Sequence, residues 1–132
     1  MNAPVIEVVA ALVSRADGHT LLVRKRGTHA FMNPGGKPEP GEAHVDALRR
    51  ELHEELGLRI APERLRPLGT FTTAAANEPG HRLVAHAFAL RLCDESPVAA
   101  AEIAEARWFD PSAPFDVTIA PLAAEHLLPL LT

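Results

Sequence analysis

The sequence is most constrained by residues 36–58, where a loop rich in glycine and proline leads directly into a helix rich in carboxylates. Four apolar residues recur at helical spacing within residues 43–56: Val45, Leu48, Leu52 and Leu56. At roughly 100° per residue they form one stripe, which another layer of the protein must cover. The segment therefore predicts an amphipathic helix packed on a core, with Gly57 as its left-handed stop.

Three glutamates lie on the arc beside this stripe: Glu51, Glu54 and Glu55. Their spacing of three and four residues makes like charges repel by roughly 0.2–0.5 kcal/mol per pair. Two of them fall in the last helical turn, where the helix dipole favours cations over anions. A divalent cation with oxygen ligands would turn this repulsion into attraction, so the pattern predicts a metal-binding helix. The alternative is a solvated acidic face that Arg49 and Arg50 partly neutralise.

Two other motifs are incomplete, because each lacks a residue type that it requires. The run Gly35-Gly36-Lys37 would need Ser or Thr after the lysine to form a Walker phosphate loop, but Pro38 follows. The run from His53 would need a second histidine at position 57 to form a zinc-protease helix, but that residue is glycine.

The complete pattern runs Gly36, five residues, Glu42, seven residues, Arg50-Glu51, an aliphatic residue, any residue, Glu54-Glu55, any residue, Gly57 and an aliphatic residue. It resembles the complete box of the Nudix family, and every defining position is filled. The flanks are also similar to that family. Before the box stand Arg24-Lys25-Arg26, Phe31 and Pro34-Gly35-Gly36, and after it stand Glu102-Ile103 and Trp108-Phe109.

This resemblance implies hydrolysis of a nucleoside diphosphate linked to another moiety, with Mg²⁺ or Mn²⁺ as cofactor. Carried over by position, Glu54 and Glu55 match metal ligands of the family, together with the backbone carbonyl of Gly36. Glu51 matches a ligand or a base. Arg50 matches the residue that orients the carboxylates, and Glu42 matches a supporting acid.

The chemistry explains why carboxylates are needed here. A diphosphate is anionic and repels an attacking water, whereas cations held by carboxylates cancel phosphate charge and lower the pKa of a bound water. Members of the family often carry a further acid outside the box. Glu102 is the candidate in this chain, with Glu105 and Glu78 as rivals.

Four residues are candidates for substrate binding: Arg26, Phe31, Asn33 and Trp108. Arg26 ends a strand that enters the loop, and its guanidinium either contacts a diphosphate or stays an exposed cation. Asn33 stands where the family usually has an apolar residue, and it either reads a base edge or satisfies the loop backbone. The two aromatic residues either stack on a base or pack in the core.

Residues that are absent narrow the substrate class. Family members acting on ADP-ribose or on dinucleoside polyphosphates often carry Pro or Tyr after the box, but this chain has no Tyr and no Pro in residues 72–76. As a small member of such a family, this chain resembles the nucleoside triphosphate pyrophosphatases, including those that act on modified nucleotides. The alternative is a nucleotide-sensing binding module without turnover, although the intact glutamates favour the enzyme. A prenyl diphosphate isomerase would need a catalytic cysteine, and Cys93 is instead expected as a small buried hydrophobe in a strand.

Charge and cysteine content limit the partners and the compartment. Seventeen acidic and thirteen basic residues give a formal charge of −4, which argues against a nucleic-acid polymer, because such binding uses Lys and Arg to neutralise phosphates. A single cysteine rules out an intrachain disulfide and fits a reducing cytoplasm. No stretch approaches membrane-spanning length. We therefore expect a cytoplasmic protein that binds a small nucleotide and no membrane, and a homodimer stays open because dimers occur in the family.

The rest of the chain predicts strands on both sides of the box helix. Strands are expected at 5–13 and 21–23, joined by a turn at Asp17-Gly18, and at 68–76, 82–92 and 106–109. His86 is expected to be a satisfied core or rim histidine rather than a ligand. A second helix is expected at 119–131, with Pro121 in its first turn and Pro129 near its end, whereas residues 99–106 fit a loop or a short helix.

Two amphipathic helices must each cover a face of the sheet, which predicts one α/β domain over residues 1–132. The resemblance sharpens this expectation to a Nudix-type α/β/α sandwich with a central mixed β-sheet and its box at 36–58.

Overall fold

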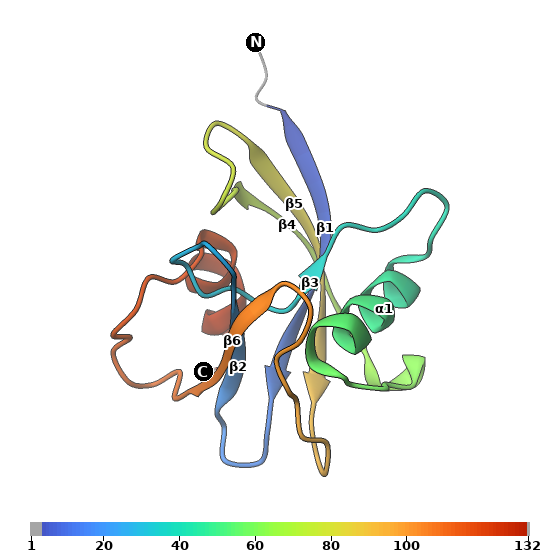
Figure 1. Ribbon diagram of the computed structural model, residues 1–132, viewed down its shortest axis with the longest axis vertical. Coiled ribbons are helices and arrows are strands. Elements are labelled where there is room, and N and C mark those ends of the chain that lie inside the picture. Colours follow the sequence, from blue (N-terminus) through green and yellow to red (C-terminus); the bar gives the residue numbers. More distant parts are fainter. Residues whose placement is uncertain (1–3, 132) are drawn as a thin grey trace.

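The computed structural model describes residues 4–131, which form a sheet with helices on both faces (Figure 1). The strands are β1 (Val5–Ser14), β2 (Thr20–Lys25), β3 (Gly35–Gly36), β4 (Arg66–Ala74), β5 (Arg82–Arg91) and β6 (Ile103–Phe109). The helical elements are α1 (His44–Leu56), η1 (Pro62–Arg64), η2 (Leu122–Leu127) and η3 (Leu128–Leu131). Within residues 4–131, no helix has the length and apolar character needed to cross a membrane.

The sheet is mixed because it contains a parallel pair. Its strand order is β4-β5-β1-β2-β6, and β3 pairs with β1. β1 and β2 form an antiparallel hairpin, whereas β1 and β5 run parallel from Val5 opposite Arg82 to Ser14 opposite Arg91. β4 and β6 add antiparallel neighbours to β5 and β2. The predicted central mixed sheet is confirmed.

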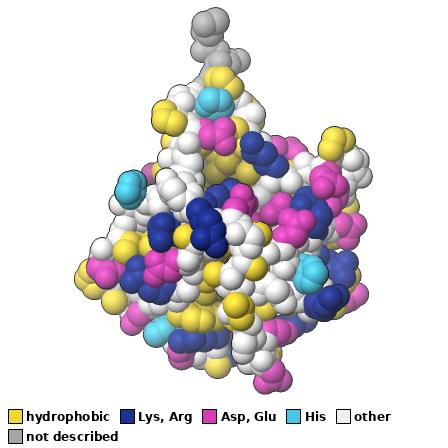
Figure 2. Space-filling model, in the orientation of Figure 1, with side chains coloured by type: hydrophobic (Ala, Val, Ile, Leu, Met, Phe, Trp, Pro, Cys, Tyr) yellow, Lys and Arg dark blue, Asp and Glu magenta, His cyan; other side chains and the backbone are white. Residues whose placement is uncertain are grey.

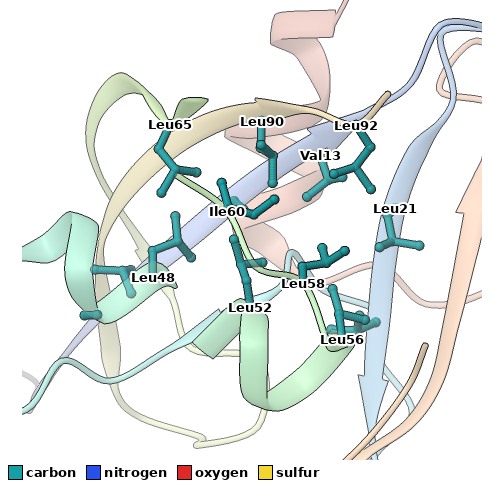
Figure 3. Packing of buried hydrophobic residues seen from close by; sticks show 14 of the residues in the cluster. Val13, Leu21, Leu48, Leu52, Leu56, Leu58, Ile60, Leu65, Leu90 and Leu92 are labelled. Atoms are coloured by element: carbon teal, nitrogen blue, oxygen red, sulfur yellow. The ribbon is translucent and has the colours of Figure 1, made fainter. Parts of the chain in front are cut away.

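Alternate residues of β1 serve two hydrophobic cores, one on each side of the sheet. On one side the stripe of α1 packs on the sheet, where Leu48 and Leu52 lie with Leu90, each at most 1% exposed (Figure 3). On the other side η2 and η3 cover the sheet, and Leu127 packs in one cluster with Leu12. The order of layers is helix, sheet, helix, as predicted.

α1 ends where the sequence predicts and carries one acid on its buried stripe. Gly57 has φ of 69°, the left-handed conformation expected at this stop. The N–H groups of Gly57 and Leu58 donate to the carbonyls of His53 and Leu52 at 3.0 and 3.2 Å, which satisfies the last turn. Glu55 is buried together with the apolar residues of the stripe. The helix therefore places a carboxylate against the sheet.

The C-terminal helix and one strand differ from the predictions. Ile119 still bridges to Phe31, and the chain becomes helical only afterwards, as a wide π turn in η2 and a tight 3-10 turn in η3. Pro129 has no N–H to donate, so a regular α-helical ladder cannot run through this segment. β6 begins at Ile103, so residues 103–106 are strand rather than loop or helix.

The expectation for Cys93 is wrong. β5 ends at Arg91, and Leu92, whose N–H donates to the Ser14 carbonyl at 2.8 Å, is the last residue of this run to be buried. Cys93 follows in a bend and is exposed.

Candidate active site

The two glycines of β3 bring the box loop against β1 and α1. A Cβ at Gly35 would lie 2.0 Å from the Val9 carbonyl oxygen, and φ of +152° disfavours any side chain there. A Cβ at Gly36 would lie 2.5 Å from Cδ of Glu51. The backbone at these positions can approach its neighbours only as glycine, and the Glu51 carboxylate consequently lies directly over Gly36.

Three carboxylates from separate parts of the chain meet beside this loop. Glu51 and Glu55 come from α1, and Glu102 comes from the turn before β6. One oxygen of each lies within 4.8 Å of the others. Ala101 precedes Glu102 with φ of 53°, a left-handed conformation that residues other than glycine adopt uncommonly. We call Glu51, Glu55 and Glu102 the acidic cluster.

Glu55 is the most buried member of the acidic cluster, with 1% of its surface exposed. The Gly35 N–H donates to its Oε1 at 3.4 Å, whereas its Oε2 is buried without a hydrogen-bond partner among the described residues. Burial, and after it the neighbouring Glu51 carboxyl, raises the pKa of Glu55 well above its usual range. A buried carboxylate short of donors is costly. The donor set therefore fits a hard divalent cation, which would bring the missing positive charge.

Arg50 holds the carboxylates around this cluster. Its Nε and Nη2 donate to the two oxygens of Glu42 at 3.0 and 2.9 Å, and its Nη1 donates to Glu51 at 2.9 Å. The planar guanidinium suits such a two-pronged contact. Arg50 lowers the pKa of the Glu42 carboxyl to about 2, first through this hydrogen-bonded pairing. Arg50 therefore orients one member of the acidic cluster while Glu42 anchors Arg50.

Other acids considered from the sequence lie outside the acidic cluster. The Glu54 side chain is 53% exposed, and its carboxylate lies 3.6 Å from Nη1 of Arg50. Of the candidates beyond the box, Glu105 pairs with an arginine of β2 at 3.7 Å and Glu78 with a lysine of the box loop at 3.8 Å. Only Glu102 among those three joins the box glutamates.

A pocket of about 380 Å³ opens beside the acidic cluster. Its charged lining includes Lys25 and two acids of the cluster, and Lys25 Nζ lies 3.6 Å from Glu102. Its apolar lining includes Ile6, Val8, Leu83 and residues 74–76. Figure 2 shows acidic and basic side chains standing next to each other across the middle of one face. The pocket can therefore take a ligand with an anionic part and an apolar part.

Asn33 is a buried polar residue in the wall of this pocket. It is 6% exposed, and neither atom of its side-chain amide has a hydrogen-bond partner in the described part of the chain. An unsatisfied buried polar group costs roughly 1–3 kcal/mol. Asn33 consequently does not satisfy the loop backbone, and its donor and acceptor are available to a ligand.

The other three substrate candidates do not line the pocket. Phe31 is 3% exposed and packs edge-on against Phe109, with ring centroids 5.3 Å apart. Trp108 lies 4.3 Å beneath the Arg15 guanidinium and packs on the core under α1. Arg26 donates to a carbonyl of the turn before β6 at 3.4 Å. In this structure Phe31 and Trp108 pack against other parts of the fold, and the direct substrate contacts expected for the three side chains stay predictions.

Lys25 is a charged pocket residue that the sequence did not single out. The run Arg24-Lys25-Arg26 does not by itself single out one of its three cations. Strand alternation could have selected Lys25, but the pairing of β2 with β6 shifts register between Arg24 and Lys25. A bulge of this kind redirects side chains, and it depends on a partner strand far away in the sequence.

Known proteins resemble this chain in sequence. The profile of the NUDIX domain matches residues 5–131. The chain is 31% identical to the human 8-oxo-dGDP phosphatase NUDT18 over 130 residues, which cover 94% of this chain and 36% of that protein. It is 36% identical to the CTP pyrophosphohydrolase of Escherichia coli K12 over 85 residues, which cover 60% of this chain and 56% of that protein. The chain thus spans about a third of the first relative and little more than half of the second.

The fold also resembles solved structures. A MutT NUDIX hydrolase from Burkholderia pseudomallei aligns over 97% of this chain and 98% of its own, with a TM-score of 0.78 and 23% identity. At that identity the likeness concerns the fold alone. Because the NUDIX profile covers nearly all of residues 1–132, this chain belongs to the NUDIX family.

Proposed function

We propose that this protein hydrolyses a phosphoric anhydride bond in a nucleoside diphosphate derivative, with Mg²⁺ or Mn²⁺ bound at the acidic cluster. The buried Glu55 carboxylate carries the proposal, because one of its oxygens lacks a hydrogen-bond partner among the described residues and it lies beside Glu51 and Glu102, which line the pocket. The preferred substrate class is a nucleoside triphosphate or a modified nucleotide. Two relatives, named for 8-oxo-dGDP and CTP, support that choice.

The donors to the cation would be the acidic cluster joined by two further groups of the box: Glu51, Glu55, Glu102, Glu54 and the backbone carbonyl of Gly36. A bound divalent cation supplies charge neutralisation for the diphosphate and a water of lowered pKa. Glu54 would exchange its contact with Arg50 for the cation, and such an exposed ion pair is worth roughly 0–1 kcal/mol. Arg50 would stay paired with Glu42 and would continue to orient Glu51.

The remaining pocket residues would bind and orient the substrate. Lys25 lines the pocket and lies 3.6 Å from Glu102 of the acidic cluster, so its ammonium would contact phosphate oxygens. Glu51, held by Arg50 beside the pocket, is the candidate to accept the proton of the attacking water. The nucleoside would lie against the apolar lining of the pocket. There it would pack on aliphatic side chains, and the amide of Asn33 would pair with a base edge.

A substrate screen with matched variants tests this function. Nucleoside triphosphates, modified nucleotides, other nucleoside diphosphate derivatives, RNA with a 5′ triphosphate and phosphate monoesters are incubated with Mg²⁺ or Mn²⁺. We expect cleavage between phosphates, which ¹⁸O-labelled water will locate by labelling the attacked phosphorus. Glu55→Gln should lower kcat/KM by roughly a hundredfold or more. Glu63→Gln, which changes an exposed acid on η1, is the control.

Two results would contradict the proposal. One is efficient hydrolysis of monoesters without activity on any nucleoside diphosphate derivative. The other is calorimetric binding of nucleotides without turnover of any of them, which would establish the nucleotide-sensing alternative.

A further inference from the structure

A second cluster of metal-binding side chains lies on the α1 side of the sheet. Glu7 comes from β1, His44 from the first turn of α1, and His86 from β5. His86 stands opposite Val9 in the sheet, and Val9 packs in the core under α1. None of Glu7, His44 and His86 lines the pocket beside the acidic cluster. We propose that these three residues form a site for Zn²⁺ or a similar transition-metal ion; we call it the histidine site.

The distances within the histidine site suit one small ion. One ligand atom of each side chain lies within 4.8 Å of the other two. His86 Nε2 and Glu7 Oε2 are 3.3 Å apart. Bonds of about 2.0–2.1 Å to a tetrahedral zinc ion place neighbouring ligand atoms roughly 3.3 Å apart. One edge of the coordination polyhedron is therefore already formed.

The state of His86 is the second observation that points to an ion. Its Nε2 is buried and makes no hydrogen bond within residues 4–131, although a carboxylate oxygen lies 3.3 Å away. Its Nδ1 lies 3.2 Å from Oγ1 of Thr70. If Nδ1–H donates to Thr70, the lone pair of Nε2 is free to bind metal, and this outer partner fixes the ring. The sequence predicts a satisfied histidine, and the structure leaves its Nε2 unsatisfied.

His44 completes the site from a different element. Its ring stacks on that of His86, with centroids 3.7 Å apart and planes 17° apart. Stacked imidazoles are close without a hydrogen bond between them. A rotation of the His44 side chain, which sits at the first position of α1, would turn its nitrogen toward the ion.

The ligand types separate the histidine site from the acidic cluster. Imidazole nitrogen suits Zn²⁺, Co²⁺ and Ni²⁺, whereas Mg²⁺ prefers oxygen ligands alone. The Glu7 side chain is 55% exposed, so an ion can enter from solvent and keep a water as its fourth ligand. Bound metal would tie the start of α1 to β1 and β5. Its expected role is therefore structural and independent of hydrolysis.

Calorimetric titration with Zn²⁺ tests the histidine site without any assay of activity. The parent is Glu55→Gln in excess Mg²⁺, so that the acidic cluster is not the zinc site. We expect one Zn²⁺ per chain, and binding at least roughly tenfold weaker after His44→Ala. His53→Ala, which removes an exposed histidine from the same helix, should bind like the parent. Thr70→Val should weaken binding roughly tenfold, because it removes only the outer partner of His86.

Co²⁺ provides an independent spectroscopic readout. The parent should give the visible absorption of nitrogen-bound tetrahedral cobalt, and His44→Ala should lose it. His44 lies at a helix end, so this variant should fold, and circular dichroism checks that it does. Zinc binding by His44→Ala equal to that of His53→Ala would overturn the proposal. So would the absence of zinc binding by the parent.

Discussion

Glu55 and Asn33 are both buried, and each has a polar atom without a hydrogen-bond partner in the part of the chain that the structure describes. Such groups are disfavoured in an ordinary core, because burial removes water that nothing replaces. Both flank one pocket, since Gly35, which lines it, donates to Glu55 and Asn33 lies in its wall. Two buried and unsatisfied polar groups therefore lie next to the same pocket, and such energetically unfavourable groups usually mark a functional site.

The raised pKa of Glu55 predicts how metal-free stability depends on pH. The folded protein keeps the proton at pH values where the unfolded chain, with a value near 4.5, has lost it. The free energy of unfolding should therefore fall as pH rises from about 4.5 toward the folded pKa. Glu55→Gln should remove this slope and raise stability at pH 7.5 by on the order of 1–2 kcal/mol. Urea unfolding with EDTA at pH 5.5 and 7.5 measures it, and the half-exposed Glu54→Gln should leave the slope in place.

Asn33 predicts opposite effects on stability and on specificity. Asn33→Leu removes an unsatisfied amide of similar size, so the free energy of unfolding should rise by about 1 kcal/mol. The same change should bring the kcat/KM values for different bases closer together, because the amide no longer distinguishes their edges. Unfolding curves and a series of nucleotides that differ only in the base provide the two measurements. Unchanged discrimination would assign Asn33 no part in base recognition.

The proximity of site residues to each other was predictable where one helix carries them all. Glu51, Glu54, Glu55 and Arg50 share α1, so spacing alone places them near each other. Lys25 was not predictable, because its direction depends on a bulge against β6. The grouping of Glu102 with α1 is likewise a tertiary fact, and the sequence could only rank it among rivals.

At the scale of elements, β3 is two glycines long and joins the sheet to the site. Gly35→Ala should destabilise the protein by roughly 3 kcal/mol or more, because a Cβ would lie 2.0 Å from a carbonyl oxygen of β1. Gly41→Ala is the matched control: Gly41 has φ of +76° but open space around it, so only the backbone cost of roughly 1 kcal/mol applies. Urea unfolding compares them, and equal losses would show that the close approach of β3 is unimportant.

Elements with long hydrophobic patterns were predictable, and elements decided by a neighbour were not. α1 and the strands β1 and β5 follow their patterns nearly to the residue. Residues 103–106 are rich in Ala and Glu, yet they are strand because β2 offers them an edge. The π turn of η2 lies in a packed segment directly before η3, and the apolar spacing of the sequence does not distinguish such a turn from a regular helix.

At the scale of the whole molecule, the layers followed from two apolar helix stripes and an excess of strands, because each stripe needs a face of the sheet. The parallel pairing of β1 with β5 was not readable in the same way. An alternating pattern indicates which residues share a face of a strand, but it does not identify the neighbouring strand, and the residues that pair between β1 and β5 are 77 positions apart in the sequence.

Divalent metal should stabilise the whole fold, because a ligand that binds only the native state shifts the unfolding equilibrium. Mg²⁺ or Mn²⁺ at 100 times its dissociation constant adds about 2.7 kcal/mol, which corresponds to a rise in melting temperature of several degrees. Glu55→Gln should remove most of this rise, whereas Glu63→Gln should keep it. A melting temperature that does not move at millimolar metal would contradict a metal site at the acidic cluster.

The pairing of β1 with β5 also bears on how the protein emerges from the ribosome. Synthesis completes residues 36–58 well before β5, so the nascent helix α1 has only β1 and β2 to cover while Leu90 is still missing. A helix of 13 residues is marginal alone in water. Residues 36–58, which are the easiest segment to recognise in the sequence, therefore become stably folded only after β5 has been translated. A peptide containing only the box should accordingly be unfolded and bind metal weakly.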